Sequence, residues 1–355
     1  MIHRSSIIWI GLLQLIIYWL CKGNLHETAH WSRNINLSSP MFSPDGQFVA
    51  FKAGVVRDNI LERRLLIVDV QKWQPVYQLL VQRRKLTEGD IKNGDGQELS
   101  EEYQRYGFTW LDAERLAYFD LEGKLWFLDV KGNPARPEHV WQADRIYRVV
   151  ASHKGGYVAV ICKIPEFPGV ACVIIDTKSK SIIHKHGTSM TTDPYPVASF
   201  SADDRWLAVS DGELIDVIDL AQKQFAQQIN CEDDVVVALT FGPAPNSLLA
   251  LTYQGNIYFC DYKRGTISGS TQIGDLGELA ALKVLTVDGR KLLMAWNESD
   301  ITLYDLDKLK ICWTKALPNY GCAVSPDHRT IMVVTSDRQI SLMSLLSGKV
   351  IEKMP

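Results

Sequence analysis

The sequence has few cysteines and none of the short motifs that mark common catalytic or metal-binding sites. Its seven cysteines never form a Cys-x-x-Cys pair, so the usual basis for a zinc or iron–sulfur site is missing. Seven cysteines in 355 residues are also too few for a disulfide-stabilised scaffold. No nucleophile elbow, phosphate-binding loop or His-Glu-x-x-His motif is present. We therefore predict no catalytic residue, no metal and no cofactor.

The chain also lacks an excess of positive charge. It has 38 Lys and Arg against 41 Asp and Glu, a formal net charge of -3. Proteins that bind nucleic acid usually present a basic surface, so nucleic acid is excluded as a partner class. A hydrophobic content of 46% is typical of a globular protein with a large core.

One long apolar run is present, at the N-terminus. It extends from Ile7 to Leu20, follows His3 and Arg4, and ends at Cys21. Its length fits the core of a signal peptide, about 7–15 residues, and falls short of the roughly 20 of a membrane-spanning helix. Residues 1–23 are expected to be a helical membrane anchor or a signal peptide, with a buried helix as the remaining alternative. In the first two cases, residues 24–355 are exported or held at a membrane.

After this run, no ten-residue stretch shows the apolar spacing of a helix. Instead, a short apolar segment that ends in aspartate recurs at intervals of 39 to 60 residues. The longest interval contains a charged insertion at residues 82–105. In the seventh copy a serine takes the place of the aspartate. The seven positions are Asp69, Asp129, Asp176, Asp219, Asp261, Asp305 and Ser344.

Each copy also contains an earlier turn, most clearly Ser43-Pro44-Asp45 in the first copy and Ser325-Pro326-Asp327 in the last. β-Branched and aromatic segments flank the turns, which is typical of strands. The pattern predicts four strands in each unit of about 40–45 residues, the signature of a β-propeller with seven four-stranded antiparallel blades. The chain resembles a degenerate member of the WD-repeat and YVTN-type propeller group over residues 28–355. This group mostly supplies rigid binding platforms and includes a minority of enzymes.

Two segments compete to complete the seventh blade. The stretch around Trp31 aligns with the outer strand that contains Trp313, since each tryptophan precedes its Ser-Pro-Asp turn by the same number of residues. The segment from Val350 to Met354 stands at the equivalent place after Ser344. A propeller must cover the edge that an open ring would leave, and we favour the Trp31 segment as the strand that does so.

Tyrosine recurs just before the first strand of four repeats. In the propellers that this chain resembles, the inner strand begins at the top face, so these rings are expected near one opening. They could bind a peptide or small ligand, because tyrosine combines a large contact area with a polar tip. The alternative is that each ring packs between neighbouring blades. The candidate partner-binding residues are Tyr106, Tyr147, Tyr195 and Tyr320.

The insertion at 82–105 is expected on the top face. Its Asn93–Gly96 segment and Glu102 match part of a calcium-binding loop counted from Ile91. Ile91 cannot act as the first ligand, so a charged loop without calcium is favoured, with partner contact as a secondary role.

Two further pairs are weaker candidates. His184 and His186 share one side of a predicted strand, because alternate residues face the same way, but surface histidines are the favoured reading over a metal site. Cys162 and Cys172 flank a hairpin and are expected as two free buried thiols rather than a disulfide.

The predicted function is therefore a non-enzymatic interaction platform, membrane-anchored or exported, that binds a protein or peptide on its top face. The alternative is a propeller enzyme, such as a metal-dependent hydrolase or lactonase with its site at the central channel. An enzyme needs polar groups on the inner strands, and these strands read as apolar with small hydroxyls, which favours the platform.

Overall fold

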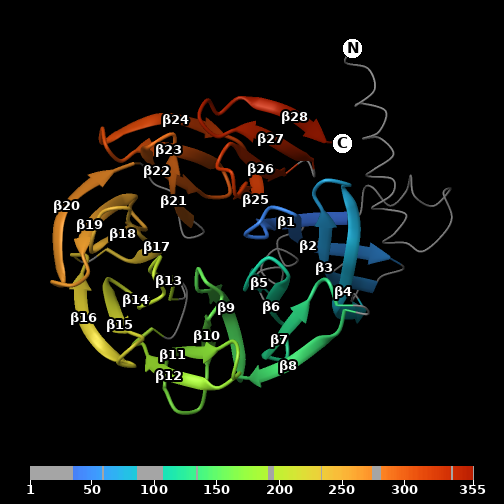
Figure 1. Ribbon diagram of the computed structural model, residues 1–355, viewed down its shortest axis with the longest axis horizontal. Helices are drawn as coiled ribbons and strands as arrows, with labels where there is room; N and C mark the ends of the chain where they lie inside the picture. Colours follow the sequence, from blue (N-terminus) through green and yellow to red (C-terminus); the bar gives the residue numbers. More distant parts are fainter. Residues whose placement is uncertain are drawn as a thin grey trace. The chain divides into compact units, whose positions relative to one another are not determined.

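The computed structural model describes residues 35–57, 60–85, 107–132, 135–190, 196–232, 234–273, 281–336 and 339–354. In these residues, strands β1 to β28 form seven antiparallel sheets of four strands each (Figure 1). The fold is the predicted all-β, seven-bladed propeller, with one sheet per blade. The apolar segment 1–23 lies outside the described residues. Within them, no helix has the length and apolarity that crossing a membrane requires.

The strands fall into two compact units. One unit contains the first and the last sheet. The first is β1 (Ile35–Phe42), β2 (Phe48–Arg57), β3 (Ile60–Asp69) and β4 (Gln74–Lys85). The last is β25 (Asn319–Val324), β26 (Thr330–Thr335), β27 (Ile340–Ser344) and β28 (Val350–Met354). Because β4 runs to Lys85, the first residues of the predicted insertion belong to a strand, and its remainder is not described.

The other unit contains the five middle sheets. The second sheet is β5 (Gly107–Trp110), β6 (Arg115–Phe119), β7 (Lys124–Asp129) and β8 (Pro137–Gln142). The third is β9 (Arg145–Ala151), β10 (Tyr157–Lys163), β11 (Val170–Asp176) and β12 (Ile182–Gly187). The fourth is β13 (Ala198–Phe200), β14 (Trp206–Asp211), β15 (Leu214–Asp219) and β16 (Gln224–Asn230). The fifth is β17 (Val236–Phe241), β18 (Ser247–Thr252), β19 (Asn256–Asp261) and β20 (Thr266–Gln272). The sixth is β21 (Ala281–Val287), β22 (Arg290–Trp296), β23 (Asp300–Asp305) and β24 (Lys310–Ala316).

The core lies between neighbouring sheets. Middle strands such as β10 and β11 are buried almost end to end, because both faces of the third sheet are covered. Ile161 and Ile174 of the third sheet pack against Leu207 and Val209 of the fourth. A strand covered on both faces reads as a continuous apolar run rather than an alternating one, which explains the repeated "LLIVD" type of segment.

The repeated serine turn is held by its own side chains. In three copies the serine hydroxyl donates to the aspartate two residues later, at 2.5–2.6 Å. The same oxygen accepts the backbone N–H five residues later, at 2.9–3.0 Å. Both bonds close the connection between the first and second strands, as local side-chain bonding does in turns. The serines are Ser43, Ser201 and Ser325.

The recurring aspartate after the third strand has a similar role. Its Oδ1 accepts the backbone N–H groups two and three residues later, at 2.7–3.2 Å, and so fixes the turn into the fourth strand. In the seventh copy Ser344 makes this turn through its backbone, by accepting the N–H of Gly348 at 2.9 Å. Gly348 has a φ of 62°, which a glycine adopts without steric cost.

The fourth strand of the last sheet is β28, which pairs with β27 in an antiparallel register. The prediction that the segment around Trp31 takes this place is wrong, because Val350–Met354 occupies it. A hairpin to the next strand in sequence requires a much shorter loop than a strand from the other end of the chain, and therefore loses less entropy. Trp31 itself lies outside the described residues.

The first and last Ser-Pro-Asp turns contact each other within their unit. Gly46 has a φ of 72°, and a Cβ placed on it would lie 3.3 Å from the ring of Pro326. The two turns that resemble each other in sequence are therefore neighbours, and Gly46 combines a left-handed backbone with a close approach.

Replacing Ser201 by alanine tests the serine turn. The N–H of Trp206 then loses its acceptor, so we expect the free energy of unfolding to fall by about 1 kcal/mol. Urea unfolding measures the change. Ser179→Ala, which removes an exposed hydroxyl from another turn, is the matched control and should cost clearly less. An equal loss in both variants would contradict the role given to the serine turn.

Candidate functional site

Of the four candidate tyrosines, Tyr147 and Tyr320 lie in the described residues, whereas Tyr106 and Tyr195 lie outside them. Tyr147 is on β9 and is half-buried. Its ring packs against the apolar cluster between the third and fourth sheets, and the guanidinium carbon of Arg145 lies 5.0 Å from its centroid. Tyr147 therefore has the contacts expected of a packing residue.

Tyr320 has the opposite surroundings, because 47% of its surface is exposed. It lies on β25, the inner strand of the last sheet. In the same unit β1 runs beside β25, and Met41 of β1 is 37% exposed. A tyrosine and a methionine thus reach the surface from two neighbouring inner strands. Met41 was not among the predicted residues, since nothing in its sequence context distinguishes it from a core methionine.

The backbone brings these strands unusually close. A Cβ on Gly321 would lie 3.0 Å from the backbone nitrogen of Ser39 and 3.2 Å from Cδ of Pro40. Gly321 has a φ of 133°, and its N–H donates to Oδ1 of buried Asn319 at 3.0 Å. A larger residue at 321 would push the two strands apart.

Both strands are also irregular at this point. The register of β1 on β2 shifts between Ser38 and Met41, and that of β25 on β26 shifts between Asn319 and Cys322. Such bulges turn side chains away from the direction that a regular strand would give them. We call Ser39–Met41 together with Asn319–Gly321 the β1–β25 surface.

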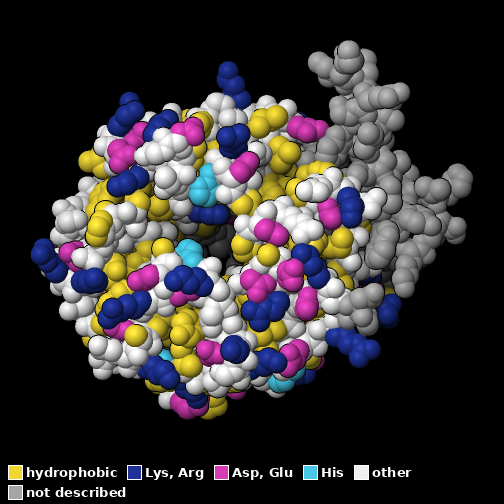
Figure 2. Space-filling view, viewed as in Figure 1, with side chains coloured by type: hydrophobic (Ala, Val, Ile, Leu, Met, Phe, Trp, Pro, Cys, Tyr) yellow, Lys and Arg dark blue, Asp and Glu magenta, His cyan; other side chains and the backbone are white. Residues whose placement is uncertain are grey.

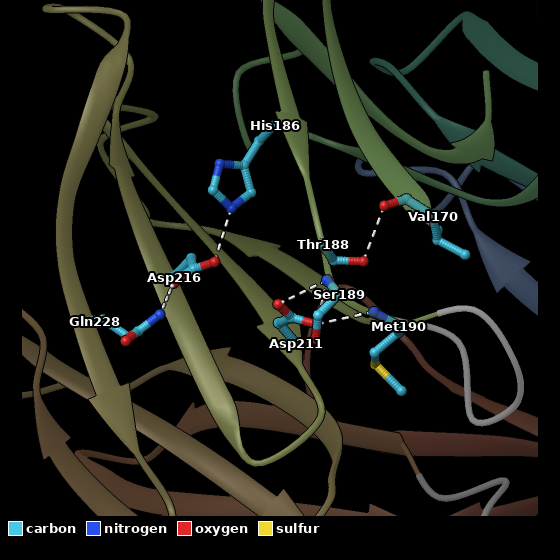
Figure 3. A network of polar contacts seen from close by, with 8 residues as sticks. All are labelled: Val170, His186, Thr188, Ser189, Met190, Asp211, Asp216 and Gln228. Carbon is cyan, nitrogen blue, oxygen red and sulfur yellow. Dashed lines mark hydrogen bonds and ion pairs between the residues drawn. The ribbon is translucent and has the colours of Figure 1, made fainter. Parts of the chain in front are cut away.

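The two histidines form part of a polar seam between the third and fourth sheets. His184 and His186 of β12 do share one side of the strand, with ring centroids 6.4 Å apart. Nε2 of His186 lies 2.8 Å from Oδ2 of Asp216 on β15, and Nε2 of Gln228 on β16 donates to Oδ1 of that carboxylate at 2.9 Å (Figure 3). Phe225 of β16 stacks on His186 at 6.4 Å.

Asp216, the acidic partner of His186, was not among the residues predicted from the sequence. It is only 5% exposed, and a buried carboxylate needs hydrogen-bond or charge partners. An aspartate inside the apolar "LIDVID" segment indicates a buried carboxylate that needs a partner, but the sequence does not specify which residue that partner is. A strand of the neighbouring sheet supplies that residue.

A second carboxylate holds the loop that follows β12. Asp211 accepts the N–H groups of Ser189 and Met190 and the hydroxyl of Ser189, at 2.9–3.2 Å (Figure 3). The serine hydroxyl therefore points to Asp211 and not to His186, so these side chains do not make a Ser-His-Asp relay. The seam joins two sheets.

No three His, Cys, Asp or Glu side chains in the described part of the chain are grouped so that they could hold a metal ion. The partial calcium motif at 91–102 lies outside that part. Cys162 and Cys172 are free and buried, as predicted. They pack into different clusters on opposite faces of the third sheet.

Charges of both signs alternate over the face drawn in Figure 2, with hydrophobic side chains between them. No protein-family model matches the chain, and no curated protein matches it significantly.

The pKa of His184 generates a prediction about acid stability. Burial and the charge of His186 lower this pKa, against the opposing effect of a hydrogen bond to the backbone of Lys223. The pKa of His184 is therefore lower in the folded state than in the unfolded state, where it is about 6.5. Neutral His184 contributes to the free energy of unfolding above about pH 6.5, and this contribution is lost as the pH falls from about 6.5 through the folded-state pKa.

The variant His184→Gln removes this proton-binding site. We expect the difference in unfolding free energy between wild type and variant to stay constant between about pH 7 and 8. The wild type should lose stability relative to the variant as the pH falls from about 6.5 to 5. Urea midpoints at each pH measure the difference, and a parallel decline of both proteins would contradict the prediction.

Proposed function

We propose that this propeller is a non-enzymatic interaction platform, anchored in a membrane or exported through residues 1–23, that binds a protein or peptide partner. The observation that carries the proposal is the exposure of Tyr320 beside Met41 on the β1–β25 surface. Large aromatic and methionine side chains are enriched where proteins bind one another. A single exposed hydrophobic residue is ordinary, but two on adjacent inner strands offer a contact for one partner side chain.

The backbone beneath this surface supports the same function. The close approach of Gly321 to Ser39, and the bond from Gly321 to Asn319, hold Tyr320 on a rigid base. A side chain on a rigid strand loses less conformational entropy on binding than one on a mobile loop. Tyr106 and Tyr195 remain predicted members of the binding face. A membrane anchor formed by residues 1–23 would keep this face accessible to soluble partners.

Site-specific photocrosslinking tests the proposal. A benzophenone amino acid replaces Met41, and the protein is irradiated in its native membrane or secreted fraction. We expect an adduct of discrete mass that an excess of purified wild-type propeller suppresses. Propeller with Tyr320→Ala should compete less well by a factor of about five or more, because truncating a central interface tyrosine costs more than about 1 kcal/mol.

Tyr253 provides the matched control. It is also a tyrosine and is 44% exposed, but it lies in the turn between β18 and β19. Propeller with Tyr253→Ala should compete as well as the wild type. Equal competition by all three proteins, or no adduct at position 41, would refute the proposal. Hydrolysis of a lactone or ester that a metal chelator abolishes would support the enzyme alternative instead.

A further inference from the structure

Two arginines of β9 face the same side of the third sheet. Arg145 pairs with Lys163 of β10, and Arg148 pairs with Ile161. Lys163 and Ile161 are alternate residues of β10 and share one face, and paired residues of neighbouring strands share a face as well. A register shift that leaves Tyr147 unpaired makes this possible, since residues three apart would face opposite ways in a regular strand. Ile161 packs between the third and fourth sheets, so this face turns toward the fourth sheet.

Three cations are therefore neighbours on this face. Arg145 and Lys163 stand directly opposite each other, where the Cβ atoms of an antiparallel pair are about 5 Å apart. Arg148 lies about 7 Å further along the sheet, because two residues of a strand rise by that distance. All three side chains are exposed. Like charges that are directly opposite destabilise a sheet, so this arrangement lowers stability until an anion joins it.

No carboxylate within the described part of the chain forms an ion pair with these three cations. The inner strands β5, β9 and β13 contain neither Asp nor Glu. Asp144 directly precedes Arg145, but its carboxylate makes no ion pair with the cluster among the residues that the structure describes. Asp211 of the fourth sheet already accepts hydrogen bonds from Ser189 and Met190. The positive charge on this face is therefore left for a ligand to neutralise.

The surroundings of Arg148 favour an anionic ligand. The inner strand beside β9 is β13, which has only three residues and begins at Ala198; residues 191–195, which precede it, lie outside the described residues. Solvent reaches the Arg148 side chain, although desolvation by the surrounding protein lowers the pKa of its guanidinium. An anion beside this group meets less competition from water than it would on an open surface, and the attraction is stronger.

We propose that Arg145, Arg148 and Lys163 form a binding site for an extended acidic peptide segment. A peptide in the β conformation places alternate side chains on one face, about 7 Å apart, which is the separation between Arg148 and the Arg145–Lys163 pair. Two alternate Asp or Glu residues therefore reach both positions, and a guanidinium binds a carboxylate through two parallel hydrogen bonds. A single phosphate group reaches only one position. The site belongs to the unit of five middle sheets and does not require the β1–β25 surface.

Fluorescence anisotropy with a labelled synthetic peptide tests the proposal. The probe is a short peptide that alternates glutamate and threonine, and its control has glutamine in place of every glutamate. Both are added to the full chain in detergent at low ionic strength. We expect the acidic probe to bind, the glutamine probe not to bind, and added salt to weaken the binding. Inorganic phosphate should compete only weakly, because it cannot reach both positions.

Arg148→Gln should weaken binding of the acidic probe about tenfold or more, since hydrogen bonds to a charged group typically contribute at least that factor. Arg264→Gln is the matched control, because it removes an exposed arginine from the turn between β19 and β20 of the same unit. This variant should bind like the wild type. Tyr320→Ala should also bind the probe normally, which separates the failure of this site from the failure of the proposed partner surface.

Lys163→Gln keeps the test decisive if Arg148→Gln does not fold. It should weaken binding of the acidic probe and melt no lower than the wild type, because it removes the like charge opposite Arg145. Weaker binding accompanied by a lower melting temperature would assign the cluster a structural role and overturn the proposal. A wild type that does not bind the acidic probe, that binds both probes equally, or that phosphate inhibits as strongly as unlabelled peptide does would overturn it too.

Discussion

Within each compact unit, the described sheets depend on apolar contact with the sheets packed beside them. The inner positions of strands such as β10, β11 and β15 are buried on both faces. A four-stranded sheet cannot cover two apolar faces by itself, so one blade has no stable fold without its neighbours. The contacts between neighbouring sheets together supply the stability, and the turns only have to lead the chain into the next strand.

This division explains which residues repeat and which vary. The serine turn and the aspartate after the third strand recur because each satisfies backbone N–H groups that no strand pairs with. Ends of the inner strands carry no such requirement. At β1 and β25 they bulge, approach closely at Gly321, and expose Met41 and Tyr320. The proposed binding surface therefore lies at strand ends where no side chain is required to bond a backbone N–H group of a turn.

The seams also carry polar and reactive groups in particular places. Between the third and fourth sheets, Asp216 joins His186 to Gln228. Between the fourth and fifth sheets, Cys231 and Cys260 belong to one apolar cluster. A buried polar pair fixes how two sheets are aligned more specifically than apolar packing does, because it tolerates little displacement. The two seams therefore differ in chemistry, although their backbones repeat.

The sequence by itself determined the class of fold, the number of blades and the turns. Those features depend on residues that are neighbours in the sequence, such as the Ser43-Pro44-Asp45 turn and the strand that ends at Asp69. They can therefore be recognised from the sequence alone. Only the tertiary structure decided that β28 and not the Trp31 segment completes the last blade, that Tyr320 is exposed while Tyr147 is packed, and that His186 faces Asp216. These outcomes depend on contacts between different strands or blades. Spacing along the chain does not specify them, because each side chain has several neighbours compatible with the same repeat.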